Sequence, residues 1–478
     1  MQNIFVSSEV GTLRRLIIHS PDSGLGKVVP SKAQDWLFED IVHLQTMRRD
    51  EYDYYLKILL YFLDKEKVQG KLKEIDADTS RDFYKPEKEK YFKSDKVIEF
   101  ESLLADILHM PEVRTELTAA VCAIEECSFQ FQKELAKLSV IDLAKVLITG
   151  TMPSNKMLFP PIPNLIFTRD IGIVVNDHLL LNKPAKYART RESLLAKYIF
   201  FNHPVFANLR GKIIEITEDE NHFLLAEEEQ EGRLNTLEGG DVMMVAPNHL
   251  LIGVSERTTV EAARQAIDLL FAKKVVSKIT IIKIPQKRDY MHIDTIFTQI
   301  KCNVWVLLGS LGRVQEEAEK QQTWEQLGQK PGYETLIIKQ FINKPDGVKI
   351  KDFANLEDLL GSVTRDDLNC YDEIKFIYSG NNQFPYGARE QWTDSCNLLA
   401  LKAGVAIGYD RNDHTAQAFR NAGFKTINAI ELLEKFESNE LSPETLRDTI
   451  IMLPSAELSR ARGGSHCMSL PILRDNAI

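Results

Sequence analysis

A cysteine near the end of the chain is the first residue whose type and setting suggest chemistry. Cys467 follows the stretch Gly463-Gly464-Ser465-His466 and precedes an apolar segment that contains Pro471. Glycine adopts backbone conformations that other residues resist, so the two glycines could hold the thiol at a fixed, exposed point. Such a thiol can act as a nucleophile when a proton carrier lies beside it. Taken alone, the stretch favours a plain loop with a free cysteine, because a short motif is weak evidence.

Three other short segments contain a histidine or carboxylates that could serve this thiol. They are PNLIFTRD (163–170), LEGGD (237–241) and MHIDTIF (291–297), which contain Asp170, Glu238, Asp241, His292 and Asp294. Histidine provides a proton carrier, and a carboxylate orients the imidazole and stabilises its charged form. Each segment also has a simple structural interpretation, namely a surface ion pair, a glycine turn or a polar strand edge.

An internal repeat gives a reason why these segments would meet. Runs of strand-forming residues, each followed by a turn and a second run, begin at Asp170, Asp241, Asp294 and Asn397. A strand-rich unit that cannot bury its own face predicts a ring or stack of such units. In a ring, equivalent positions converge on the centre, so the polar residues that open the hairpins would lie together. His178 and His249, at the turns, would lie away from the centre, and we interpret both as structural.

The remaining pattern predicts a strand-rich part with a helical insertion. Residues 13–19 favour a short strand, and apolar residues at helical spacing between 32 and 149 predict a bundle of about five helices. We therefore expect a catalytic domain of residues 1–31 and 150–478 and an inserted helical bundle of residues 32–149. We interpret residues 309–368 and 431–453 as surface elaborations of the catalytic domain.

Composition limits the classes of partner. The chain has 478 residues, of which 44% are apolar, and a net charge of −10, which argues against nonspecific nucleic-acid binding. Neither a secretory signal nor a membrane-spanning run is visible, and the six cysteines show no CxxC pair or disulfide framework. We expect a cytoplasmic homo-oligomer with reduced thiols that acts on a small molecule, with neither nucleic acid nor membrane as a partner.

The surplus of carboxylates calls for a cation, which could be a metal or the substrate. Like charges crowded in one pocket are unfavourable unless a cation lies between them. A metal site could use His292, Asp294, Glu238 and Asp241 as ligands, but the chain shows no HExxH or paired-cysteine spacing. A planar guanidinium instead fits two flanking carboxylates bidentately, and its central carbon is an electrophile for a thiol.

Seven motifs, taken in order, carry a resemblance to a known family. They are FTRD, EGGD, SERTT (255–259), HIDTIF, REQWTDSCN (389–397), GYDRN (408–412) and RGGSHCMSLPI. Together they resemble the motifs of arginine deiminases, within the guanidino-group-modifying superfamily. The resemblance implies an α/β fold, namely the five-bladed pseudo-symmetric β/α-propeller called the pentein fold, with an inserted α-helical domain. It also implies that the N-terminal strand and the C-terminal segment complete the fifth blade.

The resemblance implies roles for individual residues and requires no cofactor and no metal. Cys467 would attack the guanidinium carbon and form a covalent thiouronium intermediate, while Asp170 and Asp294 would hold the guanidinium nitrogens. His292 would protonate departing ammonia and then activate water, with Glu238 in support. The substrate-binding residues would be Asn164, Arg189, Arg257, Arg462 and Asp241. The pair Ser465-His466 departs from the commonest pair in the family, and we interpret His466 as a loop or gating residue rather than a second base.

The function expected from the motifs is hydrolysis of L-arginine to L-citrulline and ammonia. Within the superfamily, amidino transfer to an amine and hydrolysis of another guanidino compound are alternatives. From other classes, the chain could be a metal-dependent hydrolase, or an arginine-binding regulator without activity.

Overall fold

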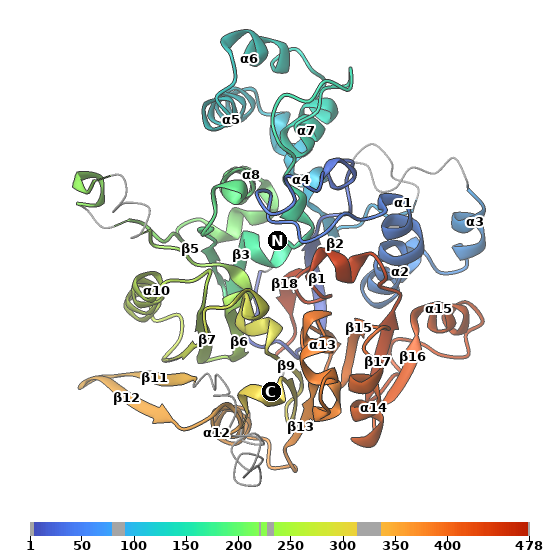
Figure 1. Ribbon diagram of the computed structural model, residues 1–478, viewed down its shortest axis with the longest axis vertical. Helices are drawn as coiled ribbons and strands as arrows, with labels where there is room; N and C mark the ends of the chain where they lie inside the picture. Colours follow the sequence, from blue (N-terminus) through green and yellow to red (C-terminus); the bar gives the residue numbers. More distant parts are fainter. Residues whose placement is uncertain (1–3, 79–90, 219–220, 227–233, 313–335, 477–478) are drawn as a thin grey trace, which may run out of the picture.

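The computed structural model describes residues 4–78, 91–218, 221–226, 234–312 and 336–476. Within these residues the strands form five small sheets, which lie around the middle of the view in Figure 1 with helices outside them. No helix in these ranges is long and apolar enough to cross a membrane.

Each sheet contains an antiparallel pair of strands and a further strand that runs parallel to one member of the pair. The sheets are β3 (Gly172–Val175), β4 (His178–Leu181) and β5 (Ile213–Ile214); β6 (Val242–Ala246), β7 (His249–Val254), β8 (Lys278–Lys283), β11 (Ile337–Lys344) and β12 (Gly347–Phe353); β9 (Phe297–Lys301), β10 (Val304–Leu307) and β13 (Lys375–Tyr378); β14 (Leu399–Lys402), β15 (Val405–Tyr409), β17 (Thr449–Leu453) and β16 (Lys425–Asn428); and β18 (Leu470–Arg474), β1 (Leu13–Ile18) and β2 (Val97–Glu99).

Helices connect the parallel strands, because parallel neighbours need a crossover connection. α8 lies between β4 and β5 in the chain, α10 between β7 and β8, and α2 between β1 and β2. α10 begins after Thr259, whose side chain accepts a hydrogen bond from the backbone N–H of Ala262. The α-helices of the described residues are α1 (Leu44–Thr46), α2 (Asp53–Leu63), α3 (Leu72–Ala77), α4 (Phe100–Leu108), α5 (Pro111–Ile124), α6 (Phe129–Leu135), α7 (Val140–Thr149), α8 (Thr190–Asn202), α10 (Val260–Ala272), α12 (Leu356–Ser362), α13 (Tyr386–Trp392), α14 (Asp413–Asn421) and α15 (Ala429–Glu437).

The four hairpins expected from the repeat are present as β3–β4, β6–β7, β9–β10 and β14–β15. A fifth antiparallel pair joins β1 to β18, with Leu16 opposite Pro471 and Ile17 opposite Leu470. The two ends of the chain therefore share one sheet. Because β18 begins three residues after Cys467, this pairing anchors the loop that contains the cysteine.

The range 32–149 contains a strand as well as helices. β2 pairs in parallel with β1, with Leu16 opposite Val97, so α2 is a crossover helix and not part of a separate bundle. α2 shares a hydrophobic core with β14, β15 and β17, whereas α4, α5 and α7 share a different core with α8. Figure 1 shows α5, α6 and α7 projecting from the rest of the molecule. β2 has only three residues, which is too short for a strand period to be visible in the sequence.

Two stretches that we interpreted as surface elaborations contribute to the core. β17, inside residues 431–453, pairs with both β15 and β16 and is largely buried. In residues 309–368, α12 buries Leu356, Leu359 and Leu360 in the core that contains β9 and β10. The interpretation was therefore wrong for β17 and α12. The hairpin β11–β12 is an extension, because β11 pairs with the outer strand β8 of the neighbouring sheet.

Candidate active site

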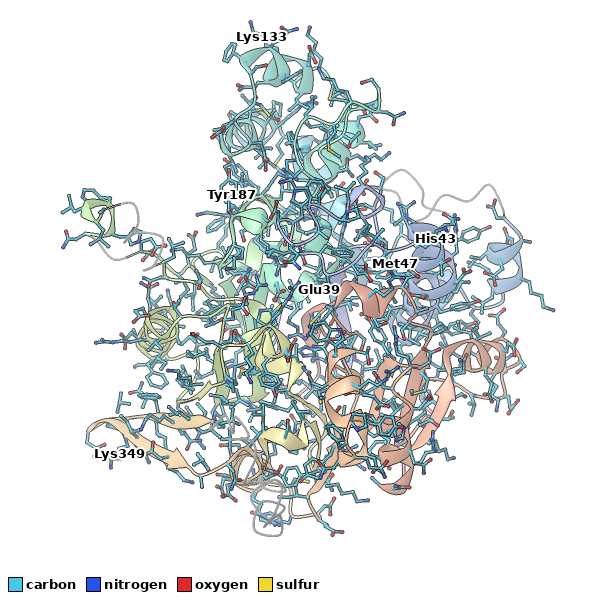
Figure 2. The ribbon with its side chains drawn as sticks, viewed as in Figure 1. Glu39, His43, Met47, Lys133, Tyr187 and Lys349 are labelled. Atoms are coloured by element: carbon cyan, nitrogen blue, oxygen red, sulfur yellow. The ribbon has the colours of Figure 1, made fainter. Side chains whose placement is uncertain are left out.

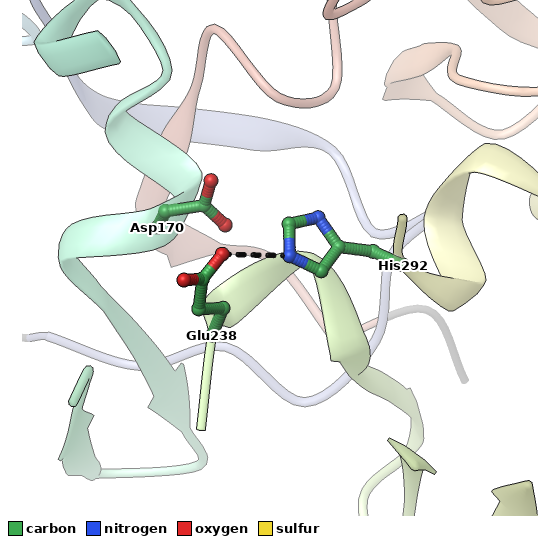
Figure 3. Close-up of side chains that lie close together, drawn as sticks. All are labelled: Asp170, Glu238 and His292. Carbon is green, nitrogen blue, oxygen red and sulfur yellow. Dashed lines mark hydrogen bonds and ion pairs between the residues drawn. The ribbon is translucent and has the colours of Figure 1, made fainter. Parts of the chain in front are cut away.

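Three short 3-10 turns, each directly before the first strand of a hairpin, bring the expected carboxylates and histidine together. The turn at residues 168–171 contains Asp170, the turn at 239–241 follows Glu238, and the turn at 293–295 follows His292 and contains Asp294. Figure 3 shows Asp170, Glu238 and His292 pointing toward one another, with Nε2 of His292 2.9 Å from Oε2 of Glu238. All four residues are buried. The convergence expected from the repeat is present for these residues.

Gly240 is needed because two of these turns approach each other closely. A Cβ atom at this position would clash with the ring and Cβ of His292. The backbone N–H of Gly240 also donates a 3.0 Å hydrogen bond to Oδ1 of Asp170. The EGGD segment therefore positions both the histidine and the aspartate.

The loop before Cys467 has glycines for a different reason from the one expected. Neither Gly463 nor Gly464 has a φ in the left-handed region, whereas Arg462 has a φ of 59°. A Cβ on Gly463 would clash with the ring of Phe167, and one on Gly464 would clash with Asn397. The glycines allow the loop to pass close to its neighbours, and the left-handed turn is made by Arg462.

Cys467 is held from both sides by Asn397. Oδ1 of Asn397 accepts a 3.0 Å hydrogen bond from the backbone N–H of Cys467, and Nδ2 lies 3.1 Å from Sγ. Sγ is also 3.4 Å from Oδ2 of Asp294. Burial raises the pKa of the Cys467 thiol well above 9.0, and the nearby charges of Asp294 and Asp170 raise it further. Burial and these charges therefore favour the protonated thiol over the thiolate.

Asp294 links the cysteine to a second histidine. Its Oδ2 lies 2.9 Å from Nδ1 of His466, and Nε2 of His466 lies 3.1 Å from Oε2 of Glu9. Burial opposes ionisation of Asp294, but the hydrogen bond and charge of His466 outweigh it and lower the pKa. Among the described residues, Oδ1 of Asp294 has no hydrogen-bond partner. His466 thus positions Asp294, which differs from the loop or gating role that we expected.

The His292–Glu238 pair is an ion pair over a wide pH range. Burial favours the neutral histidine, but Asp170 and the hydrogen bond to Glu238 outweigh it and raise the pKa of His292 to about 10. Burial likewise opposes ionisation of Glu238, but the His292 bond and the charge of Arg189 lower its pKa to about 2. At neutral pH, His292 is therefore a cation that can donate a proton.

Arg189 lies where the guanidinium of a substrate was expected. Its Nη1 is 2.7 Å from Oδ2 of Asp170 and 3.5 Å from Oε2 of Glu238, and its Nη2 is 2.9 Å from Oε2 of Glu192. We expected this side chain near the other end of the substrate. In this structure it neutralises the carboxylates itself.

A small pocket connects these groups to the other expected substrate-binding residues. Its cavity has a volume of about 30 Å³ and is lined by Asn164, Asp170, Arg189, Arg257, His292, Arg462 and Cys467, among others. Glu39, close to the middle of the view in Figure 2, also lines it. The guanidinium of Arg462 stacks 3.5 Å from the ring centre of Trp392, and among the described residues its Nε and Nη1 have no hydrogen-bond partner. A cavity of this size holds a water molecule or two, so an amino acid can enter only if side chains move.

Asp241 does not line this pocket. Its Oδ1 accepts a 3.0 Å hydrogen bond from the backbone N–H of Ile293, and its Oδ2 accepts a 2.6 Å bond from the hydroxyl of Ser255. This carboxylate ties the turn after His292 to the SERTT segment. Its geometry supports a positioning role and not the substrate contact that we expected.

The ligand atoms of Asp170, Glu238 and His292 lie within 4.8 Å of one another, a spacing that suits a metal ion. This set differs from the metal ligands considered from the sequence, because Asp294 and Asp241 are not part of it. Glu238 already bonds to His292, and the cationic Arg189 lies against both carboxylates. The charge of the carboxylates is therefore balanced by groups of the chain itself.

Some residues that build the site were not identified from the sequence as site residues. Asn397 opens a hairpin, as Asp170 and Asp294 do, and that shared position is a usable signal in the sequence. Glu192 and Glu9 carried no such signal, because they lie at other positions of the chain and meet the site only through contacts with Arg189 and His466.

A family model described as arginine deiminase matches residues 100–474. The chain belongs to the arginine deiminase family. This confirms the family expected from the motifs, and the chain is an enzyme of that family. Arginine deiminases from Oenococcus oeni and from Listeria monocytogenes serotype 4b are 27% and 26% identical to it over 481 and 477 residues. Each alignment covers 99% of this chain and 98% of the relative.

Among solved structures, an amidinotransferase of saxitoxin biosynthesis from Microseira wollei is similar to this arginine deiminase family member. The two chains are 13% identical, with a TM-score of 0.49, and the match covers 98% of this chain and 97% of the other.

Proposed function

We propose that the protein hydrolyses L-arginine to L-citrulline and ammonia through a covalent intermediate on Cys467. The observation that carries this proposal is the arrangement around Sγ of Cys467. The thiol touches Asp294, whose other oxygen has no partner among the described residues, and Cys467 lines the same pocket as His292, which pairs with Glu238. The family and its curated relatives support arginine as the substrate.

Asp294 and Asp170 would bind the guanidinium group of the substrate. Two carboxylates on either side of a planar cation satisfy its N–H groups and keep it protonated, which keeps its central carbon electrophilic. Arg189 now occupies this position on Asp170, at 2.7 Å. Substrate binding therefore requires the Arg189 side chain to leave its carboxylate partners, so that the substrate can take its place. The freed guanidinium of Arg189 can then bind the α-carboxylate of the substrate.

Binding of a cation beside the thiol would lower the pKa of Cys467 and release its proton, because the thiolate is then stabilised. The sulfur attacks the guanidinium carbon, and His292 donates a proton to the amino group as the carbon–nitrogen bond breaks and ammonia leaves. The neutral His292 then removes a proton from water, which attacks the thiouronium carbon. The carbon–sulfur bond breaks, and citrulline and the free cysteine are released.

The decisive experiment is incubation with arginine followed by intact-mass analysis. We expect the wild-type protein, quenched rapidly with acid during turnover, to carry an adduct with the mass of arginine minus ammonia, located by peptide mapping at Cys467. Cys467→Ala should form neither adduct nor citrulline, whereas Cys127→Ala, a thiol in the helical part, should retain activity. Citrulline production by Cys467→Ala would refute the proposal.

The reaction with arginine alone also separates hydrolysis from amidino transfer. Release of citrulline and ammonia in the absence of any amine supports the deiminase. An absolute requirement for an acceptor amine would replace it with an amidinotransferase, and turnover of a different guanidino compound only would change the substrate.

The spacing of Asp170, Glu238 and His292 favours a metal-dependent hydrolase as the second candidate. Exhaustive chelation and thiol alkylation distinguish the two. Loss of activity on chelation with none on alkylation supports the metal enzyme, and the reverse supports nucleophilic cysteine chemistry.

We further propose that the five sheets are the blades of a pseudo-symmetric β/α-propeller, the pentein fold. The repeated order of hairpin, crossover and parallel strand supports this. In this proposal the catalytic domain includes β2 and α2, and the inserted helical part begins with α4.

A further inference from the structure

A pair of cysteines lies beside the sheet of β9, β10 and β13, and neither lines the pocket just described. Cys302 is in the turn between β9 and β10, and Cys370 follows the π-helical turn at residues 363–367. Their Sγ atoms are 2.6 Å apart, although the residues are 68 positions apart in the chain. Both are free thiols in this structure. We propose that Cys302 and Cys370 are a redox modification site, at which a hydroperoxide converts the two thiols into a disulfide.

The backbone holds the two cysteines together independently of their sulfur atoms. Nδ2 of Asn303 donates a 2.7 Å hydrogen bond to the carbonyl of Glu373, and the carbonyl of Asn303 accepts a 2.8 Å bond from the N–H of Lys375. The parallel pairing of β10 with β13 begins at the next residue, with Val304 opposite Lys375. On the other side, the N–H of Cys370 donates a 3.0 Å bond to the carbonyl of Thr364. These hydrogen bonds hold the backbone on both sides of the pair in place, with the two sulfur atoms facing each other.

The reaction consumes one hydroperoxide. Cys302 is the more accessible thiol, since Cys370 is only 9% exposed, so the peroxide oxidises Cys302 to a sulfenic acid and is itself reduced to water or an alcohol. The sulfur of Cys370 then attacks the sulfenic sulfur, the S–S bond forms, and the departing hydroxide takes up the thiol proton as water. Two thiol hydrogens are lost in total.

The surroundings of Cys302 affect the rate at which its thiol is oxidised. Burial raises the pKa of Cys302 to about 12, the Cys370 thiol and Asp372 raise it as well, and Lys301 opposes them. Because the thiolate is the reactive form, a thiol with this pKa reacts slowly at neutral pH. We therefore expect the disulfide to form slowly at neutral pH.

The crosslink would close a long loop that contains β11, β12 and α12. A disulfide that closes a long loop restricts the unfolded chain and thereby stabilises the folded one. We expect the midpoint of thermal unfolding to rise by several degrees on oxidation and to return on reduction. This inference does not depend on the proposed catalytic activity.

The test uses the full-length folded protein, hydrogen peroxide, alkylation of the remaining thiols and peptide mapping without reductant. We expect a peptide pair linked through Cys302 and Cys370, absent after reduction and absent in Cys302→Ser and Cys370→Ser. The matched control is Cys127→Ser, because Cys127 is also partly exposed and interacts with another thiol, Cys122. This control should still form the linked peptide.

Three results would overturn the inference. They are recovery of both cysteines as alkylated peptides from folded, peroxide-treated wild-type protein, a linkage that forms only between chains, and a linkage that forms only after unfolding in urea. The mapping of the wild-type protein keeps the test valid if a serine variant fails to fold. An unchanged unfolding midpoint despite a complete linkage would refute the stabilising effect.

Discussion

Single residues set the charge balance of the pocket. Asp170, Glu238 and Asp294 supply negative charge, and His292 and Arg189 supply the cations that face it. Cys467 stays protonated because the carboxylates and burial both oppose a thiolate. In the proposed mechanism, binding of the cationic substrate therefore promotes formation of the Cys467 thiolate.

The side chain of Asn397 should matter for catalysis because it holds both the backbone and the sulfur of Cys467. We expect Asn397→Ala to lower kcat/KM by about 10- to 100-fold, the equivalent of one or two lost hydrogen bonds. Steady-state citrulline production measures this. The exposed Asn421→Ala is the matched control and should be unaffected, and a wild-type rate for Asn397→Ala would contradict the prediction.

His292 should make stability depend on pH in the alkaline range. Its pKa rises from 6.5 to about 10 on folding, so its contribution is fully present below pH 6.5 and is lost as the pH rises through about 10. Between pH 7 and pH 10, the free energy of unfolding should fall by on the order of 3 kcal/mol more in the wild type than in His292→Asn. Urea unfolding at both pH values measures the difference.

The matched control for this measurement is His109→Asn, an exposed histidine after α4. It should follow the wild-type pH dependence. Equal pH dependence in the wild type and His292→Asn would show that the ion pair with Glu238 does not stabilise the fold.

At the level of elements, the 3-10 turns before β3, β6 and β9 hold the side chains of the site in nearly fixed positions. Each turn contacts the next through a short bond, such as Gly240 N–H to Asp170 and Ile293 N–H to Asp241. A small change in one turn is therefore transmitted to the functional groups on its neighbour.

Gly240→Ala tests this coupling. The new Cβ would clash with His292, so we expect at least about a 100-fold loss in kcat with retained folding, because the histidine is displaced from Glu238. Gly361→Ala in α12, where the nearest atom to a new Cβ is 3.7 Å away, is the control and should be active. Circular dichroism checks the fold, and near-normal kcat for Gly240→Ala would contradict the close approach.

At the scale of the whole molecule, one sheet has an extension that packs on the core without lining the pocket. β11 and β12 lengthen the sheet of β6, β7 and β8, and neither strand lines the pocket. Damage to this extension should affect stability more than catalysis. The expected homo-oligomer and the cytoplasmic location stay predictions, and light scattering of the purified protein tests the former.

Ile338 and Ile337 are neighbours on β11, and substitutions of them can separate an effect on stability from an effect on catalysis. Ile338 is 2% exposed and Ile337 is 50% exposed. Ile338→Ala should lower the free energy of unfolding by about 2 to 4 kcal/mol, and Ile337→Ala by less than about 1 kcal/mol. Urea unfolding measures both, and KM for arginine should be unchanged in each. A large rise in KM for Ile338→Ala would show that the extension supports the pocket.

The sequence by itself predicted the central residues of the proposed site. The hairpin repeat, the residue types at its openings and the ordered motifs identified Asp170, Glu238, His292, Asp294 and Cys467, because local periodicity and motif spacing are properties of neighbouring residues. The same reasoning found the antiparallel hairpins, since each is formed by adjacent segments with a turn between them.

The tertiary structure decided which contacts those residues make. Arg189 lies on the carboxylates, and Asp241 ties two turns together. His466 links Asp294 to Glu9, which lies 457 positions before His466 in the chain. Likewise β2 and β17 join their sheets by pairing with distant strands, which three to five residues of sequence do not reveal. The physical reason is that side-chain partners and parallel pairing depend on packing between remote segments, for which local sequence patterns carry no signal.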